Sequence, residues 1–229
     1  MKKFLLAIVP LCLMVVSLQA KEYKVAVTPS NAKIYVDGNY YADGVATINL
    51  KSKTGFVVVK MECPGYITTE AKIYAGDKRN AISYTLRRDG FFDVSVASGL
   101  VNKYFNVKVS KDLYKIGEDG KMDVSLAWKM IHKVILNYFD EIQTTDIASG
   151  FVQTPWKYTT FPDAEKQVRT RVSVKQNSFG DELSFQIKVS SEAGSVYASR
   201  RDESFQEIDR ILKELEPIIS EFQTRLGDK

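Results

Sequence analysis

The stretch that decides the fold of the first third of this chain is VTPSNAKIYVDG, residues 27–38. Its Pro-Ser-Asn segment at 29–31 predicts a turn, because proline presets φ and short polar side chains favour tight turns. Ile34 and Val36 then alternate with Lys33 and Tyr35, which predicts a strand with one buried face. The Asp-Gly pair at 37–38 predicts a second turn, of the kind that closes a β-hairpin.

The same alternation extends on both sides of this stretch. Apolar residues recur at every second position before the first turn, and short apolar runs separated by turns follow the second one. No helical period occurs anywhere in residues 22–86. We therefore expect a small all-β sandwich with strands near residues 23–27, 33–36, 48–50, 56–61, 73–74 and 81–86.

Residues 27–38, together with Gly65-Tyr66 further on, resemble the PEGA domain, a short β-module of bacterial exported proteins. The module is named after a Pro-Glu-Gly-Ala turn. Pro29 and Ala32 match that turn, whereas Ser30 and Asn31 replace the Glu and the Gly. The resemblance implies a binding or spacing module over residues 21–88, and it brings no catalytic residue with it.

The N-terminus has the pattern of a secretory signal peptide. Lys2 and Lys3 precede an apolar run over residues 4–18, and Ala20 supplies the small residue at which cleavage occurs. The run is shorter than a membrane span requires. We expect residues 1–20 to be removed after Ala20 and the protein to be exported to the periplasm or envelope of a bacterium. A lipid anchor at Cys12 is the less favoured alternative, because Leu11 precedes it.

Cleavage there would change the composition in two ways. The formal net charge of +4 would fall by the two lysines to +2, which argues against a nucleic-acid partner. Cys63 would remain as a single cysteine, so no internal disulfide could form and stability would depend on packing. No other stretch is apolar enough to span a bilayer, although peripheral membrane association stays open.

Residues 87–90 (Arg-Arg-Asp-Gly) predict a domain boundary, and residues 89–229 have a different pattern. Apolar positions spaced by three and four indicate a helix from about 123 to 139. Alternating segments before and after it indicate an antiparallel sheet. The expected strands cover residues 105–109, 142–147, 151–158, 168–174 and 183–189.

The C-terminal residues predict a long helix. From Phe205 to Leu226 the apolar residues repeat at steps of three and four, Ser204 and Glu207 have the spacing of a capping box, and Pro217 should kink the helix. An α+β domain with this helix across its sheet is expected.

This order of elements is similar to the helix-grip domain of accessory lipoproteins of outer-membrane assembly. The stretch 146–156 and the Arg-Thr-Arg segment at 169–171 are the part that is similar.

Residues suited to catalysis are few. His132, the one histidine, lies beside an apolar helical stripe, and Cys63 has the character of a buried small hydrophobe. The acids of residues 118–123 lack the alternating spacing of a calcium loop. These patterns predict a protein that is not an enzyme and that carries no metal or cofactor.

Five residues are candidates for binding: Tyr40 and Tyr41 at a turn of the sandwich, Trp156 after Pro155, and Arg169 with Arg171 on one face of the second sheet. The arginines suit phosphate or carboxylate groups. A solvated face whose charges are balanced by acids is the favoured alternative. Pro155 also suggests an edge strand, to which another chain could add.

The favoured function is a binding or scaffolding module for an envelope protein or polysaccharide. The alternative is a carrier of lipid or another apolar ligand in a cavity between the sheet and the C-terminal helix.

Overall fold

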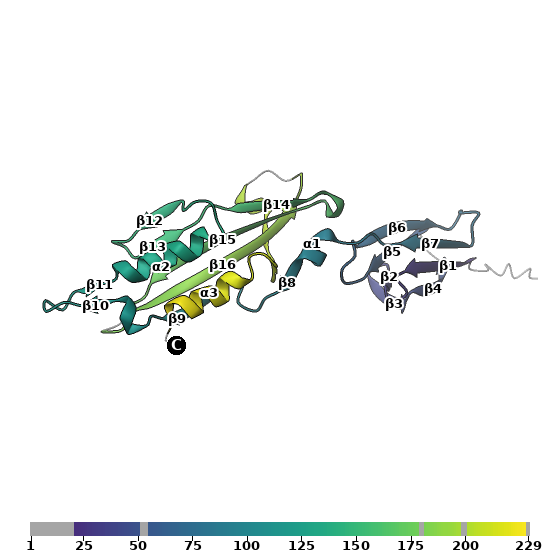
Figure 1. Ribbon diagram of the computed structural model, residues 1–229. Helices are drawn as coiled ribbons and strands as arrows, with labels where there is room; N and C mark the ends of the chain where they lie inside the picture. Colours follow the sequence, from purple (N-terminus) through teal and green to yellow (C-terminus); the bar gives the residue numbers. More distant parts are fainter. Residues whose placement is uncertain (1–20, 51–54, 179–180, 198–200, 228–229) are drawn as a thin grey trace, which may run out of the picture. The chain divides into compact units, whose positions relative to one another are not determined.

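The computed structural model describes residues 21–50, 55–178, 181–197 and 201–227 (Figure 1). The expected signal peptide lies outside the described residues. The chain divides between Arg87 and Arg88 into two compact units, each with its own apolar core.

The first unit has two sheets, and its strands confirm the predicted β-rich, sandwich-like structure. One sheet has the order β4-β1-β7, in which β1 and β7 are parallel, and the other has the order β3-β2-β5-β6. The strands are β1 (Lys21–Thr28), β2 (Lys33–Val36), β3 (Asn39–Asp43), β4 (Val45–Leu50), β5 (Phe56–Glu62), β6 (Thr69–Tyr74) and β7 (Ala81–Thr85).

The turn at residues 29–32 fixes how the chain enters the second sheet. The Ala32 amide donates to the Pro29 carbonyl at 3.0 Å, and the Ala32 methyl is fully buried. Gly44 lies against the same turn, with its amide donating to the Ala32 carbonyl at 2.8 Å. A Cβ on Gly44 would lie 2.2 Å from the Ser30 carbonyl oxygen, and its φ is +65°, so this crossing between β3 and β4 requires glycine.

The second unit is built on a long hairpin of β15 (Lys166–Gln176) and β16 (Ser184–Ser195) (Figure 1). Two strands in succession pair with the free side of β15, and two others pair with the free side of β16. These are β13 (Phe151–Gln153) and β14 (Lys157–Phe161) beside β15, and β9 (Tyr104–Lys108) and β17 (Gln206–Glu207) beside β16; β12 (Thr144–Asp146) extends the sheet beyond β13.

Both longer helices, α2 (Ser125–Leu136) and α3 (Pro217–Leu226), pack on one face of this sheet. Trp128 of α2 meets Phe185 of β16 edge to face at 4.9 Å between ring centroids, and Phe222 of α3 is fully buried in the same core. The shorter elements are α1 (Gly90–Val94), β8 (Ser95–Ala97), β10 (Lys115–Ile116), β11 (Met122–Asp123) and β18 (Arg210–Leu212), which pairs with β8.

The predicted long C-terminal helix is wrong in its extent. The helix begins at Pro217, and the residues before it form a short 3₁₀ turn at 202–204 and the strands β17 and β18. Pro217 stands in the first turn of α3, where a missing amide costs no helical hydrogen bond. Phe205, Leu212 and Leu215 are buried as the spacing suggested, but from turns and strands rather than from one helical face.

Candidate functional site

The polar face of the second sheet, opposite the two helices, holds three of the five candidate residues. Along β15 the valines at 168, 172 and 174 point to the helices, so Arg169 and Arg171 share the other face, as predicted. The favoured alternative, a solvated face balanced by acids, fits Arg169 only in part: Glu192 balances the charge, but Arg169 is not solvated. Its side chain is only 2% exposed, because other residues fold over it.

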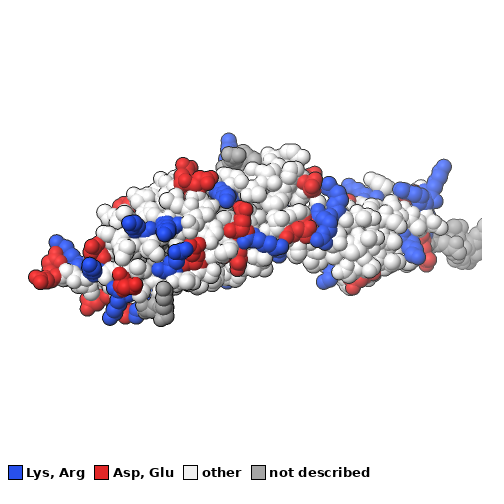
Figure 2. All heavy atoms as spheres, in the orientation of Figure 1, with Lys and Arg blue, Asp and Glu red and all other residues white. Residues whose placement is uncertain are grey.

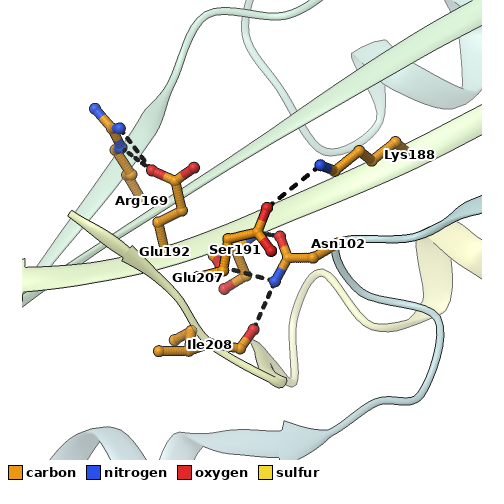
Figure 3. A network of polar contacts seen from close by, with 7 residues as sticks. All are labelled: Asn102, Arg169, Lys188, Ser191, Glu192, Glu207 and Ile208. Atoms are coloured by element: carbon orange, nitrogen blue, oxygen red, sulfur yellow. Dashed lines mark hydrogen bonds and ion pairs between the residues drawn. The ribbon is translucent and has the colours of Figure 1, made fainter. Parts of the chain in front are cut away.

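Arg169 is held by one carboxylate and two rings. Its Nε and Nη2 donate to the same Glu192 oxygen at 2.8 and 2.5 Å, from directly across the β15–β16 ladder (Figure 3). The guanidinium carbon lies 4.2 Å from the ring centroid of Trp156 and 4.2 Å from that of Phe205. Stacking between rings favours a guanidinium over an ammonium group, so lysine could not replace this arginine.

Arg171 stacks on Trp156, the same ring that Arg169 contacts. Its guanidinium carbon is 4.1 Å from the Trp156 ring centroid, so one indole contacts both guanidinium groups. Arg171 is partly exposed, and its Nε is buried without a hydrogen-bond partner. Within the described residues no acidic side chain forms an ion pair with Arg171, and the residue across the ladder is Ser190. Among the described residues, Arg171 thus has no counterpart to the carboxylate that holds Arg169.

Trp156 lies in a break between two strands, β13 and β14. The predicted single strand 151–158 is two strands, β13 and β14, because Pro155 has no amide to continue the ladder. Thr154 bridges the break: its amide donates to the Val172 carbonyl and its hydroxyl accepts from the Val172 amide, both at 3.0 Å. The indole that follows thus lies over the arginines.

Phe205 reaches the site because the segment that carries it passes close to β16 at Gly194, which has no side chain. A Cβ on Gly194 would lie 2.6 Å from the Ser204 carbonyl oxygen and 3.2 Å from the Phe205 ring. Tyr158 of β14 supports the same ring edge to face, at 6.0 Å between centroids. The sequence pattern predicts a helix at Phe205 and gives no sign of Glu192. The contacts of these two residues with Arg169 depend on the register of the β15–β16 hairpin, which the sequence does not show.

Asn102 fixes the segment that carries Phe205 and Glu207. Its amide nitrogen donates to the carbonyls of Ser191 and Ile208, at 3.1 and 2.8 Å, and its oxygen accepts from the Ser191 amide at 2.9 Å (Figure 3). Glu207 then lies 3.4 Å from the Lys188 ammonium group. The Asn102 side chain therefore ties the loop to β16, and the site is preorganised.

A second cation and ring extend the same face. The Lys175 ammonium lies 4.9 Å from the Tyr104 ring centroid, and both side chains are exposed. Between them and Arg171, Gln153 donates to the Ser173 hydroxyl at 2.8 Å. Charges of both signs alternate over the side of the molecule seen in Figure 2, so the molecule shows no extended basic area there. We call Trp156, Arg169, Arg171, Glu192 and Phe205 the arginine–tryptophan site.

Tyr40 and Tyr41 belong to the first unit and are not part of this site. They lie within β3 rather than at a turn, and both are exposed. A β-bulge separates their directions: Tyr40 pairs with Tyr35 of β2, whereas the Tyr41 hydroxyl donates to the Thr47 carbonyl of the other sheet at 2.8 Å. The two tyrosines therefore cannot act together on one ligand.

The residues considered for catalysis have structural contacts. His132 Nδ1 lies 2.8 Å from the Trp128 carbonyl oxygen one helical turn earlier. Cys63 is buried in the first unit, with its Sγ 3.7 Å from Asn31 Oδ1. In the part of the chain that is described, no three His, Cys, Asp or Glu side chains cluster as metal ligands.

A groove of about 960 Å³ lies beside α3, where Met130 of α2, Tyr138 and Glu221 line it. The apolar residues Ile218, Phe222 and Leu226 point the other way and are fully buried against the sheet. The packed contact gives no support to a carrier with a cavity between sheet and helix.

Comparison with known protein families gives a match for the first unit. Residues 19–89 match the PEGA domain, and this range covers the described residues of the first unit. No curated protein matches the chain. Among the described residues, no helix has the length and apolar character needed to cross a membrane.

Proposed function

We propose that this chain is a non-catalytic binding protein of a bacterial cell envelope, and that the arginine–tryptophan site binds an acidic polysaccharide. The observation that carries the proposal is the state of Arg171. The fold supplies a carboxylate to Arg169, yet it leaves the neighbouring guanidinium partly exposed, stacked on Trp156 and without an acid among the described residues.

The chemistry of the site favours a sugar acid. A guanidinium forms paired hydrogen bonds to a carboxylate, and these are stronger than neutral hydrogen bonds. The partly exposed indole beside it offers an apolar surface to the flat side of a sugar ring. Lys175 on Tyr104 adds positive charge along the same face, whereas Lys188 on the next strand is paired with Glu207.

The envelope location rests on two supports. The match to the PEGA domain fits export, since this domain occurs in exported proteins. The N-terminal pattern of Lys2, Lys3, an apolar run and Ala20 fits a cleaved signal. We also propose that the second unit is of the helix-grip type, because an antiparallel sheet carries its terminal helix on one face.

The test is binding of polygalacturonate, with neutral dextran for comparison, to residues 21–229 by titration calorimetry. We expect the acidic polymer alone to bind, and the affinity to fall as salt screens the charges. Arg171→Gln should weaken binding about tenfold or more, since a charge-assisted hydrogen bond contributes about 1.5–3 kcal/mol.

Lys133→Gln is the matched control, because Lys133 is an exposed cation on α2, which packs on the opposite face of the sheet. It removes the same charge and should leave the affinity nearly unchanged. Equal losses in Arg171→Gln and Lys133→Gln would mean that only net charge matters. No binding of the acidic polymer by the folded wild type would reject the proposal.

A further inference from the structure

The outer face of the four-stranded sheet in the first unit carries aromatic rings among its charged side chains. On β5 the residues Val57, Val59 and Met61 point into the core, so Phe56 and Lys60 point outward. Six of the outward residues form what we call the tyrosine face: Tyr35, Tyr40, Phe56, Lys60, Lys72 and Tyr74.

One ring pair lies where β3, β2 and β5 run side by side. Tyr40 is paired with Tyr35 and meets it edge to face, at 6.0 Å between centroids. Lys60, across the next ladder, places its ammonium group 5.4 Å from the Tyr35 centroid. Tyr40 remains 57% exposed, so a supported ring is presented to solvent.

A second ring pair of the same design lies further along the face. Phe56 and Tyr74 are directly opposite on β5 and β6, with 5.6 Å between centroids. Lys72 lies 4.9 Å from the Phe56 centroid. Tyr74 is 55% exposed. Again one ring is partly buried under a lysine and supports an exposed tyrosine.

The two pairs are separated along the sheet. Phe56 and Lys60 are four residues apart on the same face of β5, which corresponds to about 13 Å at 3.3 Å per residue. Two similar subsites on one sheet face suit a ligand that repeats its own structure, because the second contact of a linked ligand forms at high effective concentration.

We propose that the tyrosine face is a polysaccharide-binding site, at which sugars of one chain occupy the Tyr40 and Tyr74 ring pairs together. The charges on the face decide between ligand classes. Lys60, Glu62 and Lys72 stand between or beside the rings, whereas the core of a protein interface is depleted of lysine and glutamate. A hydrated chain with flat apolar ring faces and many hydroxyls meets both kinds of group.

This site is independent of the arginine–tryptophan site, since it lies on the other unit and uses no residue of it. The first unit would then be a ligand-binding module rather than a spacer.

The experiment titrates residues 21–229 with oligosaccharides of increasing length. The probes are disaccharides and hexasaccharides of N-acetylglucosamine and of galacturonic acid, and peptidoglycan glycan strands freed of peptide. For the class that binds, we expect the hexasaccharide to bind about tenfold more tightly than the disaccharide. Tyr40→Ala and Tyr74→Ala should each remove most of that advantage while leaving weak disaccharide binding.

Tyr197→Ala is the matched control, because Tyr197 is 82% exposed in the second unit and its loss should change nothing. Arg171→Gln should keep the length dependence, which separates this proposal from the one for the arginine–tryptophan site. Failure of all three probe types, or equal binding by wild type, Tyr40→Ala and Tyr74→Ala with unchanged melting temperatures, would overturn the proposal. So would a protein partner that binds this face and is lost in both variants while no saccharide binds.

Discussion

Arg169 and Glu192 lie directly opposite each other across the β15–β16 ladder, and two guanidinium nitrogens of Arg169 donate to a single carboxylate oxygen of Glu192. The arginine is almost fully buried and the Glu192 side chain is 17% exposed. A buried pair of this kind adds little net stability compared with an apolar pair, but removal of one partner leaves a buried charge without compensation. Removal of either partner should therefore change the stability of the second unit more than the intact pair contributes to it.

Glu192→Gln should destabilise the second unit by about 3 kcal/mol, because Arg169 would lose its negative partner in a buried position. Urea unfolding followed by tryptophan fluorescence measures this unit selectively, since Trp128 and Trp156 are the two tryptophans of the chain. Glu207→Gln is the control. Its pair with Lys188 is longer, at 3.4 Å, and exposed, so the cost should stay below about 1 kcal/mol. Similar costs for the two substitutions would show that burial of Arg169 has no energetic consequence.

Gly194→Ala should displace the segment that covers Arg169. The added methyl would lie 2.6 Å from the Ser204 carbonyl oxygen, and relief of such overpacking costs about 1–3 kcal/mol. Near-ultraviolet circular dichroism should change as Phe205 and Trp156 lose their fixed geometry. Gly99→Ala, where a Cβ meets nothing within 4 Å, should leave both the spectrum and the stability as in the wild type. An unchanged spectrum in Gly194→Ala would contradict the close crossing.

Stability should fall at alkaline pH because of Tyr138. Burial, together with a hydrogen bond from its hydroxyl to Glu221 at 2.8 Å, raises the pKa of Tyr138 from 10.0 to about 12. A raised pKa in the folded state adds stability that is complete below pH 10 and lost as the pH rises to about 12. The difference in urea midpoint between wild type and Tyr138→Phe should therefore shrink over that interval.

Wild type and Tyr138→Phe differ only in the Tyr138 hydroxyl, so the comparison isolates that one group. A difference in urea midpoint that stays constant from pH 10 to about 12 would contradict the assigned cause.

The first unit was predictable because its information is local. Alternation in β1 and β2 and the turns at 29–32 and 37–38 depend on neighbouring residues, and these also underlie the resemblance to the PEGA domain. The crossing at Gly44 was not visible, because its need for glycine comes from Ser30, which is distant in sequence.

The arginine–tryptophan site was predictable only in part. Because side chains alternate along a strand with a period of two residues, Arg169 and Arg171 were expected on one face. Pro155 indicated the edge strand beside Trp156. Burial of Arg169 depends on Glu192 and Phe205, which reach it through the hairpin register and through a loop that crosses at Gly194. Contacts between distant residues of this kind leave no periodic signal in a sequence.

The change in stability caused by Pro217→Ala should have opposite signs for the predicted long helix and the observed short one. If the helix ran from about 204 to 226, Pro217 would lie in its interior and Pro217→Ala would stabilise the protein by about 3 kcal/mol. At the first turn of α3 the proline is compatible with the backbone and restricts the unfolded chain. Replacement by alanine should then cost up to about 1 kcal/mol. Urea unfolding of the two proteins by tryptophan fluorescence decides between a gain and a small loss. Gln223→Ala, at an exposed position of the same helix, serves as the control for a change that leaves the proline in place.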